Sequence, residues 1–362
     1  MAITVDRTGW LGLYTQMRQP SGYLSRRFTV KPGGIFDGNK VAIDIQRFGE
    51  DVAVAIKICT GPNLNDVNEY VTKEFTPPAY GEAFPLNVCE LLDRMAGVDP
   101  YTAAYQGYAA QMIQKMATGF MLIDAKIQRA VELQASQILQ TGKLTLVNKE
   151  GDTVYELDFR PKASHFPTVG TAWSDAAATP MADIEALANK IRSDGKVNPS
   201  RITFGGTAFS NFITNESVLA HLDNRRIEFG AVDPSLDDSG AIYQGRMWIG
   251  SYQYDLYTYP EEYKDPVTGD PTPYIGANNV IIDSPRTRFD MVSARVPLPL
   301  GPDPRVAGLL PGRMSSRGER FDVTPNVYCT PNGKQIMGEL ESRPLLIPVQ
   351  IDGFGCINTA GV

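Results

Sequence analysis

The chain has 362 residues, of which 43% are hydrophobic and 21% are charged. This size and composition fit a folded protein with two linked lobes. Its 34 basic and 41 acidic residues give a net charge of −7, which disfavours sequence-specific DNA binding, because that function relies on clustered Lys and Arg. No apolar run is long enough to span a bilayer, and no basic start leads into an apolar core. We therefore expect no membrane segment and assembly in the cytoplasm.

The first 36 residues differ from the rest of the chain. They carry five basic residues and one acidic residue, are punctuated by Gly and Pro, and show no persistent helical or strand period. Such a segment cannot bury a face of its own. It is therefore either a disordered tail or an arm that is ordered only where it lies across a partner. An arm is favoured by aromatic side chains, which a tail meant for solvent rarely carries: Trp10, Tyr14, Tyr23, Phe28 and Phe36.

A region with strand patterns and a long irregular stretch comes next. Hydrophobic residues alternate in residues 41–45 and again in residues 52–58, with a turn at residues 48–50 between them. Residues 60–87 are rich in Pro, Gly, Asn and Tyr and contain two short strand-like pieces, at residues 70–75 and 84–88. A structureless loop of this length is unusual inside a compact domain. We therefore predict a projecting two-stranded excursion.

Residues 101–141 are predicted to form one long helix. They contain no proline, Gly142 closes the pattern, and at about 1.5 Å per residue the helix would reach roughly 60 Å. Gly107 and Gly119 are the positions where a kink or a split is expected. Packing on the chain's own sheet is favoured over a coiled-coil seam, because regular flanking charges are missing. Side chains spaced three and four residues apart form one apolar stripe along this helix, with a single polar gap at its seventh member. The stripe comprises Ile113, Met116, Phe120, Ile123, Ile127, Ala130, Gln134 and Ile138.

The remainder mixes strands and helices irregularly, which makes the fold class α+β. An antiparallel hairpin is predicted from residues 144–147 and 154–159, and a helix is predicted to start at Pro180. The acidic, turn-rich loop at residues 260–273 is expected at a surface tip. Further helical turns are expected at residues 208–213 and 218–222, and strands at residues 202–204, 247–249, 252–259, 280–282, 321–329, 334–340 and 345–351.

The sequence offers no pattern for catalysis or cofactor binding. The two histidines, His165 and His221, lie near no second metal ligand in the sequence, and we expect polar or partly buried side chains on the surfaces of the lobes. Gly205-Gly206 follows a predicted strand but lacks the Gly-Lys-Ser/Thr ending of a phosphate loop, and no Gly-x-Ser-x-Gly elbow exists.

The carboxylates and cysteines also form no pattern that indicates catalysis or metal binding. Acidic residues cluster at positions 237–238, 261–262 and 339/341, and neighbouring acids in such segments are usually solvated. The four cysteines form no Cys-x-x-Cys pair and are expected to be reduced and mostly buried: Cys59, Cys89, Cys329 and Cys356. We therefore predict no catalytic, cofactor-binding or metal-binding residues and no enzymatic activity.

The order of these parts resembles that of a family of viral shell proteins. Residues 74–77 and Asn87 are similar to the end of that family's extended loop, and residues 134–146 to the end of its long helix with the following strand. The family is the lambda-type major capsid proteins of tailed phages (phage capsid protein E family), which have the HK97-like fold. Further similar runs are Asp183-Ile184-Glu185-Ala186, Leu222-Asp223-Asn224-Arg225-Arg226 and Ser342-Arg343-Pro344-Leu345-Leu346 with Val349.

The resemblance implies four structural parts. They are an N-terminal arm (residues 1–38), an extended loop or E-loop with its flanking strands (residues 39–90), a peripheral or P-domain, and an axial or A-domain. The P-domain would consist of residues 91–170, including the long helix as its spine, and about 320–345. The A-domain would consist of residues 171–319 and about 346–362, and its loop at residues 260–273 is a candidate for the capsomer axis.

The function that the resemblance implies is assembly of an icosahedral virion capsid. The chain would form pentamers and hexamers, enclose double-stranded DNA without sequence-specific binding, and be assembled in the host cytoplasm beside a portal. A separate scaffolding protein is implied because no fused scaffolding region precedes the first strands, and lambda-type relatives rely on a decoration protein. The candidates for contacts between subunits lie in the arm and the extended loop: Trp10, Tyr14, Tyr23, Phe28, Tyr70, Phe75, Pro77, Tyr80 and Phe84.

Two alternatives remain open at this point. One is an encapsulin-like compartment of the same fold that holds a cargo enzyme. The other is an enzyme with an unrecognised site. A covalent Lys–Asn link between subunits, as in some relatives, would draw on Lys57 or Lys73, but a decoration protein is favoured.

Overall fold

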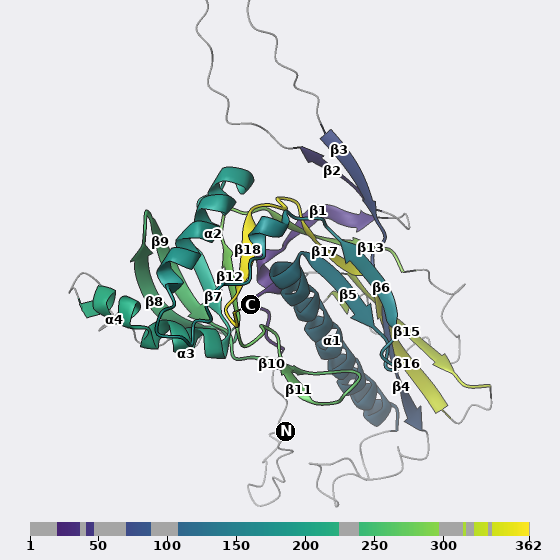
Figure 1. The fold of residues 1–362 in the computed structure, drawn as a ribbon. Helices are drawn as coiled ribbons and strands as arrows, with labels where there is room; N and C mark the ends of the chain where they lie inside the picture. Colours follow the sequence, from purple (N-terminus) through teal and green to yellow (C-terminus); the bar gives the residue numbers. More distant parts are fainter. Residues whose placement is uncertain are drawn as a thin grey trace, which may run out of the picture.

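A computed structural model of the chain describes residues 20–36, 41–46, 70–87, 108–223, 239–296, 314–315, 322–331 and 335–361. The predicted α+β class is confirmed, with helices and strands mixed along the chain. The buried hydrophobic side chains form two clusters. The first cluster surrounds the long helix, and the second fills the space between a five-stranded sheet and its helices (Figure 1). No helix within the described ranges is long and apolar enough to cross a membrane.

The long helix, α1 (Tyr108–Thr141), forms the backbone of the first cluster. Its 34 residues give it a length of about 50 Å, and Gly119 does not interrupt it. Gly142 ends the helix in the left-handed region, with φ +68°, as a helix-terminating glycine does. The predicted stripe is confirmed from Met116 onward except at Ala130, which is only half-buried while its neighbour Val131 is buried, and its polar member, Gln134, is fully buried. Residues 101–107, the predicted first turns, lie outside the described residues.

A four-stranded antiparallel sheet packs along α1. In β16 the side chains of Ile336 and Leu340 are buried in the first cluster, and alternate residues point away from it. The predicted hairpin after α1 is confirmed as β5 (Lys143–Val147) and β6 (Thr153–Asp158), of which β5 contacts this helix. The four strands are, in spatial order, β14 (Met314–Ser315), β15 (Asp322–Cys329), β16 (Gln335–Ser342) and β4 (Tyr80–Asn87).

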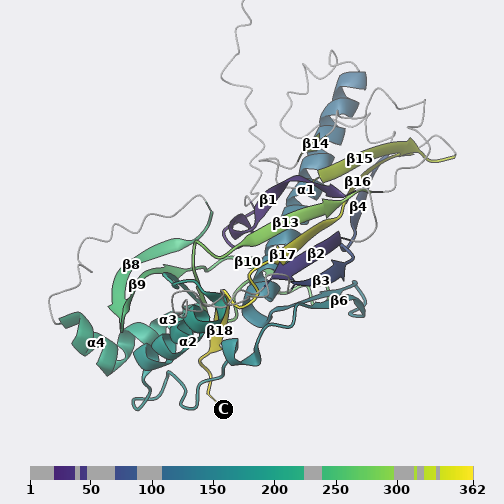
Figure 2. The ribbon, with the colours of Figure 1, turned by 90° about the horizontal axis from the view of Figure 1, so that it is seen from above.

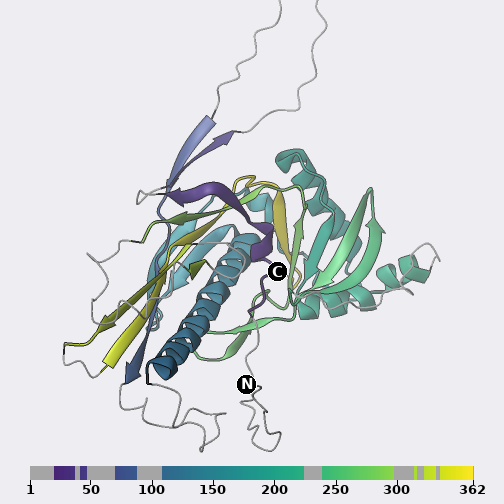
Figure 3. The ribbon, with the colours of Figure 1, turned by 180° about the vertical axis from the view of Figure 1, so that it is seen from behind.

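Two strands at the base of the extended loop leave the body of the protein. β2 (Val41–Gln46) pairs along its whole length with β3 (Tyr70–Phe75) in an antiparallel ribbon. Figures 1 and 3 show this ribbon pointing away from the clusters. The strands at residues 41–45 and 70–75 are thus confirmed, but the predicted excursion of two strands within residues 60–87 is wrong, because β3 pairs with β2 and the strand at residues 80–87 pairs with β16 instead. The predicted strand at residues 52–58 and its turn at residues 48–50 lie outside the described residues.

The second cluster lies between a five-stranded sheet and three helices. The side chains of α2 (Pro180–Gly195) and α3 (Gly206–Thr214), with Val218 of α4 (Glu216–Asp223), pack on one face of this sheet. Figure 2 shows α2 and α3 on one side of β8 and β9. The strands are, in spatial order, β18 (Phe354–Asn358), β12 (Asn279–Asp283), β7 (Arg201–Phe204), β9 (Tyr252–Thr258) and β8 (Ile242–Ile249).

A third sheet contains strands that the sequence pattern does not reveal. β1 (Thr29–Phe36) pairs in parallel with β13 (Phe289–Ala294), which pairs antiparallel with β17 (Pro344–Pro348). The absence of a strand in the first 36 residues was therefore a wrong prediction. β1 contains Pro and two Gly residues, and its pairing shifts register between Val30 and Ile35, so it has no alternating pattern. Its partner β13 is buried at every position, which also removes the alternation.

The loop predicted at residues 260–273 is a short hairpin, β10 (Glu262–Lys264) with β11 (Pro271–Pro273). Its tip is exposed, as predicted, with Val267 46% exposed. A Cβ atom added at Gly151, in the β5–β6 turn, would lie 3.6 Å from Val267. The tip therefore lies beside the first cluster, although the sequence assigned it to the lobe of the five-stranded sheet.

The two clusters are joined through the central strands. In β12, Ile281 belongs to the first cluster, whereas Val280 and Ile282 belong to the second. In β18, Cys356 belongs to the first cluster and Ile357 to the second. Because successive side chains of a strand point to opposite faces, each of these strands contributes to both cores.

Candidate assembly site: the anchor segment and the base of the extended loop

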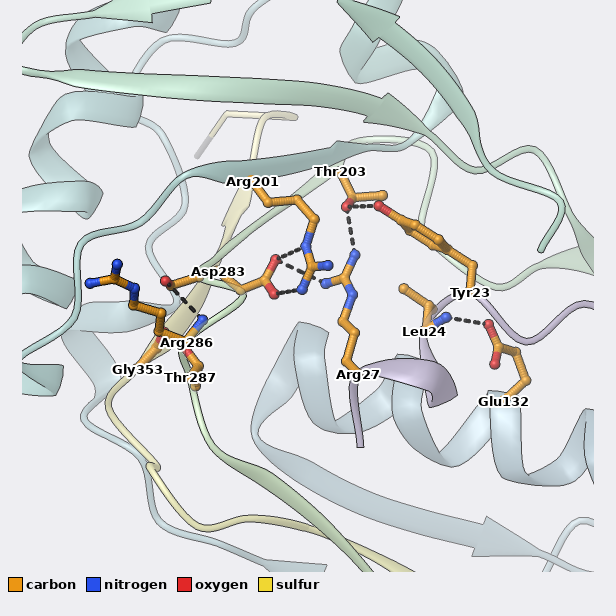
Figure 4. Close-up of polar contacts among 11 residues, drawn as sticks. Tyr23, Leu24, Arg27, Glu132, Arg201, Thr203, Asp283, Arg286, Thr287 and Gly353 are labelled. Carbon is orange, nitrogen blue, oxygen red and sulfur yellow. Dashed lines mark hydrogen bonds and ion pairs between the residues drawn. The ribbon is translucent and has the colours of Figure 1, made fainter. Parts of the chain in front are cut away.

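The stretch from Pro20 to Phe28, here called the anchor segment, lies between α1 and the five-stranded sheet. It contains a short 3-10 turn, η2 (Ser25–Arg27). The side chains of Leu24 and Phe28 are 0% and 1% exposed. Figure 4 shows that polar groups of the segment reach α1 on one side and strands β7 and β12 on the other.

Glu132 of α1 binds the backbone of the anchor segment. Its Oε1 accepts a hydrogen bond from the Leu24 amide at 2.7 Å, and its Oε2 accepts one from the Ser25 amide at 2.9 Å. The Tyr259 hydroxyl donates a third, at 2.8 Å. The carboxylate thus satisfies amides at the N-terminus of η2, where a negative charge is favourable. Burial raises the pKa of Glu132, although these hydrogen bonds act in the opposite direction.

Arg27 binds the sheet on the other side of the anchor segment. Its Nη1 lies 3.0 Å from Oδ1 of Asp283, and its Nη2 donates to the Thr203 hydroxyl at 2.7 Å. Arg201 also pairs with Asp283, through Nε at 3.1 Å and through Nη2. The side chains of Arg27 and Asp283 are 2% and 0% exposed. Burial alone would raise the pKa of Asp283, but the guanidinium groups of Arg201 and Arg27 hold it below its usual value.

Aromatic packing completes the anchor. The Tyr23 ring lies 5.8 Å from that of Tyr257 and 5.3 Å from that of Tyr259, and the Arg27 guanidinium stacks over it at 4.9 Å. The Phe28 ring lies 4.9 Å from that of Phe289. The prediction that this part of the arm is ordered only across a partner is therefore wrong for residues 20–36. Charges and rings that are distant in sequence order it within its own chain, and no local period signals them.

The base of the extended loop is held mainly by apolar packing. Phe75, at the end of β3, is 4% exposed and lies 5.5 Å from Phe159. The Tyr155 hydroxyl donates to the Thr76 carbonyl at 2.5 Å, and Arg343 Nη2 donates to the carbonyl of the buried Pro77 at 3.3 Å. These contacts join the loop to β6 and to the residue between β16 and β17.

Two further aromatic residues fix β4 against α1. Gln134 donates to the Tyr80 hydroxyl at 2.6 Å, and burial raises the pKa of Tyr80. The Phe84 ring occupies a slot between two glycines. A Cβ atom added at Gly119 of α1 would lie 2.4 Å from that ring, and one added at Gly338 of β16 would lie 2.5 Å from it. The glycine suspected of breaking the helix instead makes room for a side chain.

The nine predicted contact residues thus fall into two groups. Trp10 and Tyr14 lie outside the described residues, and for Tyr70 only the strand backbone is described. The other six pack within the chain itself: Tyr23, Phe28, Phe75, Pro77, Tyr80 and Phe84. Their role between subunits stays a prediction, and in this conformation their buried surface serves the chain's own core.

Sequence reasoning missed the charged groups that hold the anchor. Glu132 and Asp283 lie inside apolar stretches, in α1 and at the end of β12, and an acidic residue in such a position signals a buried pair. Nothing local in the sequence identifies Arg27 and Arg201 as the partners of Asp283 or the Leu24 and Ser25 amides as those of Glu132, because these contacts span more than a hundred residues, 256 for Arg27–Asp283 and 108 for Leu24–Glu132.

His165 and Cys356 are both buried. His165 is fully buried, which corrects the expectation of a partly exposed histidine, and its ring nitrogens lie 3.0 Å from the Phe354 carbonyl and 3.2 Å from Asp194. Burial raises the pKa of Cys356 to about 12, so the thiol is unreactive. Within the described ranges, no three His, Cys, Asp or Glu side chains are grouped to hold a metal.

Comparison with known proteins connects this architecture to viral shells. An Escherichia coli CFT073 prophage protein assigned as its capsid protein is similar in structure, with TM-score 0.59, 15% identity, and coverage of 94% of this chain and 93% of that one. The capsid of Ralstonia phage GP4 gives 0.49 at 12% identity over 99% and 96% of the chains, and the SrpI encapsulin of Synechococcus elongatus PCC 7942 gives 0.44 at 11% over 97% and 91%. No curated protein sequence matches significantly.

At such low identity the first of these likenesses shows the fold alone, which is the HK97-like capsid fold. The family of the chain is shown by its sequence. Residues 15–354 match the family model described as phage major capsid protein E, which leaves only short stretches at either end unmatched. The chain therefore belongs to the phage major capsid protein E family.

Proposed function

We propose that this capsid protein builds an icosahedral head from pentamers and hexamers of itself, around double-stranded DNA, and that its two projecting elements make the contacts between neighbouring copies. One observation carries the proposal. The anchor segment and the base of the extended loop are both fixed within the chain, the first by Glu132 and Asp283 and the second by Phe75 and Phe84. A fixed base gives a projecting element a defined direction, which an ordered shell requires.

The four-part division of the chain belongs to this proposal. The arm is residues 1–38, the extended loop is residues 39–90, and α1 is the spine of the P-domain. The five-stranded sheet with α2 and α3 is the centre of the A-domain. The two hydrophobic clusters support such a division, and the strands β12 and β18 contribute side chains to both clusters.

Weak contacts suffice for this function. Each copy in a closed shell contacts several neighbours, so modest interfaces act together. The net charge of −7 supports a container that does not hold DNA phosphates tightly. A strongly positive inner wall, mapped on an assembled shell, would contradict this part of the proposal.

We further propose that assembly occurs in the host cytoplasm on a separate scaffolding protein around a portal, and that a decoration protein reinforces the shell. Covalent linking through Lys57 or Lys73 is the alternative to decoration. Boiling assembled capsids in denaturant and separating the chains on a gel distinguishes the two, because crosslinked shells give a ladder and decorated shells give one band of the capsid protein.

The role requires no catalysis, and we propose that the chain has no enzymatic activity. An encapsulin-like compartment is the second candidate, and the family match favours the capsid over it. Copurification of a cargo enzyme would support the compartment. Neighbouring terminase and portal genes would support the capsid.

The decisive experiment is electron microscopy of the expressed chain, with and without a candidate scaffolding protein. We expect closed shells or capsomers, whose formation is enhanced by the scaffold. A chain that remains a stable monomer by analytical ultracentrifugation under both conditions would contradict the proposed function.

A further inference from the structure

A row of charged residues crosses the five-stranded sheet at right angles to its strands. Asp283 of β12 is paired in register with Arg201 of β7, Arg201 with Asp255 of β9, and Asp255 with Arg246 of β8. The charges alternate in sign along the row, starting from Arg27, which binds Asp283. The Nε atom of Arg246 lies 2.6 Å from Oδ1 of Asp255.

The row becomes progressively more exposed towards the edge of the sheet. Side-chain exposure rises from 0% at Asp283 to 20% at Arg201, 30% at Asp255 and 56% at Arg246. Within the described residues β8 is the last strand on this side. The row therefore ends at the exposed, positively charged side chain of Arg246. A further group that continued the alternation of sign would be a carboxylate.

An exposed aromatic side chain lies beside this cation. Trp248 is 53% exposed, although large apolar side chains are usually withdrawn from water. Met247 and Ile249 are buried in the second cluster with α2 and α3. Because strand side chains alternate, Arg246 and Trp248 point to the sheet face opposite those helices. An exposed Arg–Trp pair has the composition of interface hot spots.

The helical side of the same lobe has the complementary pair. On α4, Val218 is buried in the second cluster, while Leu219 is 48% exposed. Glu216 is also exposed and precedes Leu219 by three positions, so the two side chains share one face of the helix. One side of the lobe thus presents a cation with an aromatic group, and the other presents a carboxylate with an aliphatic group.

We propose that these two surfaces bind one another between neighbouring copies of the chain, with Arg246 and Trp248 of one copy against Glu216 and Leu219 of the next. Because the surfaces lie on opposite sides of the lobe, the contact is head-to-tail, and repetition of such a contact closes a ring. The inference rests on the proposed function and identifies the contact that joins the lobes within a capsomer.

A charge exchange tests the contact in full-length chains. The substitutions Arg246→Glu and Glu216→Arg each place like charges opposite one another, and the double substitution restores an opposite pair. We expect each single variant to raise the subunit concentration needed for shells by about tenfold or more, and the double variant to return close to the wild type. Arg246→Lys, which keeps the charge, is the matched control and is expected to assemble. Sedimentation and electron microscopy measure assembly, and circular dichroism of the subunits verifies their folding.

A disulfide test gives a second readout. In a Trp248→Cys/Leu219→Cys chain, oxidation of assembled material is expected to give covalent multimers on a non-reducing gel, whereas each single cysteine variant gives none beyond the wild-type pattern. Single charge variants that assemble like the wild type, together with no multimers, would overturn the contact while leaving the capsid function intact. Failure of the wild type itself to assemble would instead count against the proposed function.

Discussion

The anchor segment and the base of the extended loop are held in different ways. The anchor segment is fixed by buried acidic side chains, because Glu132 binds its amides and Asp283 binds Arg27. The loop base depends on ring packing, with Phe75 against Phe159 and Phe84 between two glycines. Buried charges demand specific partners, whereas apolar packing demands a matching shape. The position of the anchor segment is therefore set by a few polar side chains and that of the loop base by close packing.

The largest effect is expected for Asp283→Asn. The substitution leaves Arg27 and Arg201 buried without their counter-charge, which should lower the free energy of unfolding by about 3–5 kcal/mol. Asp255→Asn, in the same charge row but 30% exposed, is the matched control and should cost about 0.2–1 kcal/mol. Urea unfolding of the two variants measures the difference. Equal losses would contradict the view that burial of the anchor charges is what matters.

Glu132→Ala should loosen the anchor segment itself. The Leu24 and Ser25 amides lose their acceptor, at a cost of about 1–3 kcal/mol. We expect trypsin to cut after Arg26 and Arg27 faster than in the wild type. Unchanged cleavage would show that aromatic packing alone holds the segment.

Glu132→Gln removes the titratable charge of this group and keeps one of its two acceptor oxygens. Folding raises the pKa of Glu132 above its ordinary value of 4.5, so its contribution to stability is present below pH 4.5 and is lost as the pH rises through the folded-state value. The stability of the wild type relative to Glu132→Gln should therefore fall as the pH rises above 4.5. Asp283 titrates in both proteins, so its effect on the free energy of unfolding cancels in the difference between the wild type and Glu132→Gln. A difference that is independent of pH in urea titrations would contradict the expectation.

Gly119→Ala tests the loop side of the comparison. Alanine favours a helix over glycine by about 1 kcal/mol, but its Cβ atom would lie 2.4 Å from the Phe84 ring. Overpacking of this kind costs about 1–3 kcal/mol, so we expect a lower melting temperature. Gly206→Ala, at the start of α3 with open space around it, is the control and should not destabilise. Stabilisation by Gly119→Ala would show that the slot is loose.

The smallest effect is expected for Tyr155→Phe. It removes only the hydrogen bond to the Thr76 carbonyl, which is on the exposed side of the loop base, and should cost about 0.5–1.5 kcal/mol. Thermal unfolding measures it. A loss as large as that of Asp283→Asn would mean that polar contacts hold the loop as firmly as the arm.

Local patterns predicted much of the fold. The apolar stripe of α1, the hairpin of β5 and β6 and most strands of the five-stranded sheet follow from periodicity and turn residues. The strands β1, β13 and β18 were missed because burial on both faces, or interruption by Gly and Pro, removes the alternation on which such predictions depend.

The sequence by itself determined the α+β class, the spine helix, the positions of β2 and β3 without their pairing, and the family. These depend on residues close together in the chain or on the order of segments along it. Only the tertiary structure revealed that the arm begins from a charged anchor and that Gly119 accommodates Phe84. Arg27 and Asp283 are separated by 256 residues, and a pair of that kind leaves no local signal. Whether such a pair raises or lowers the free energy of unfolding depends on how deeply it is buried. That burial arises only when distant segments of the chain pack together.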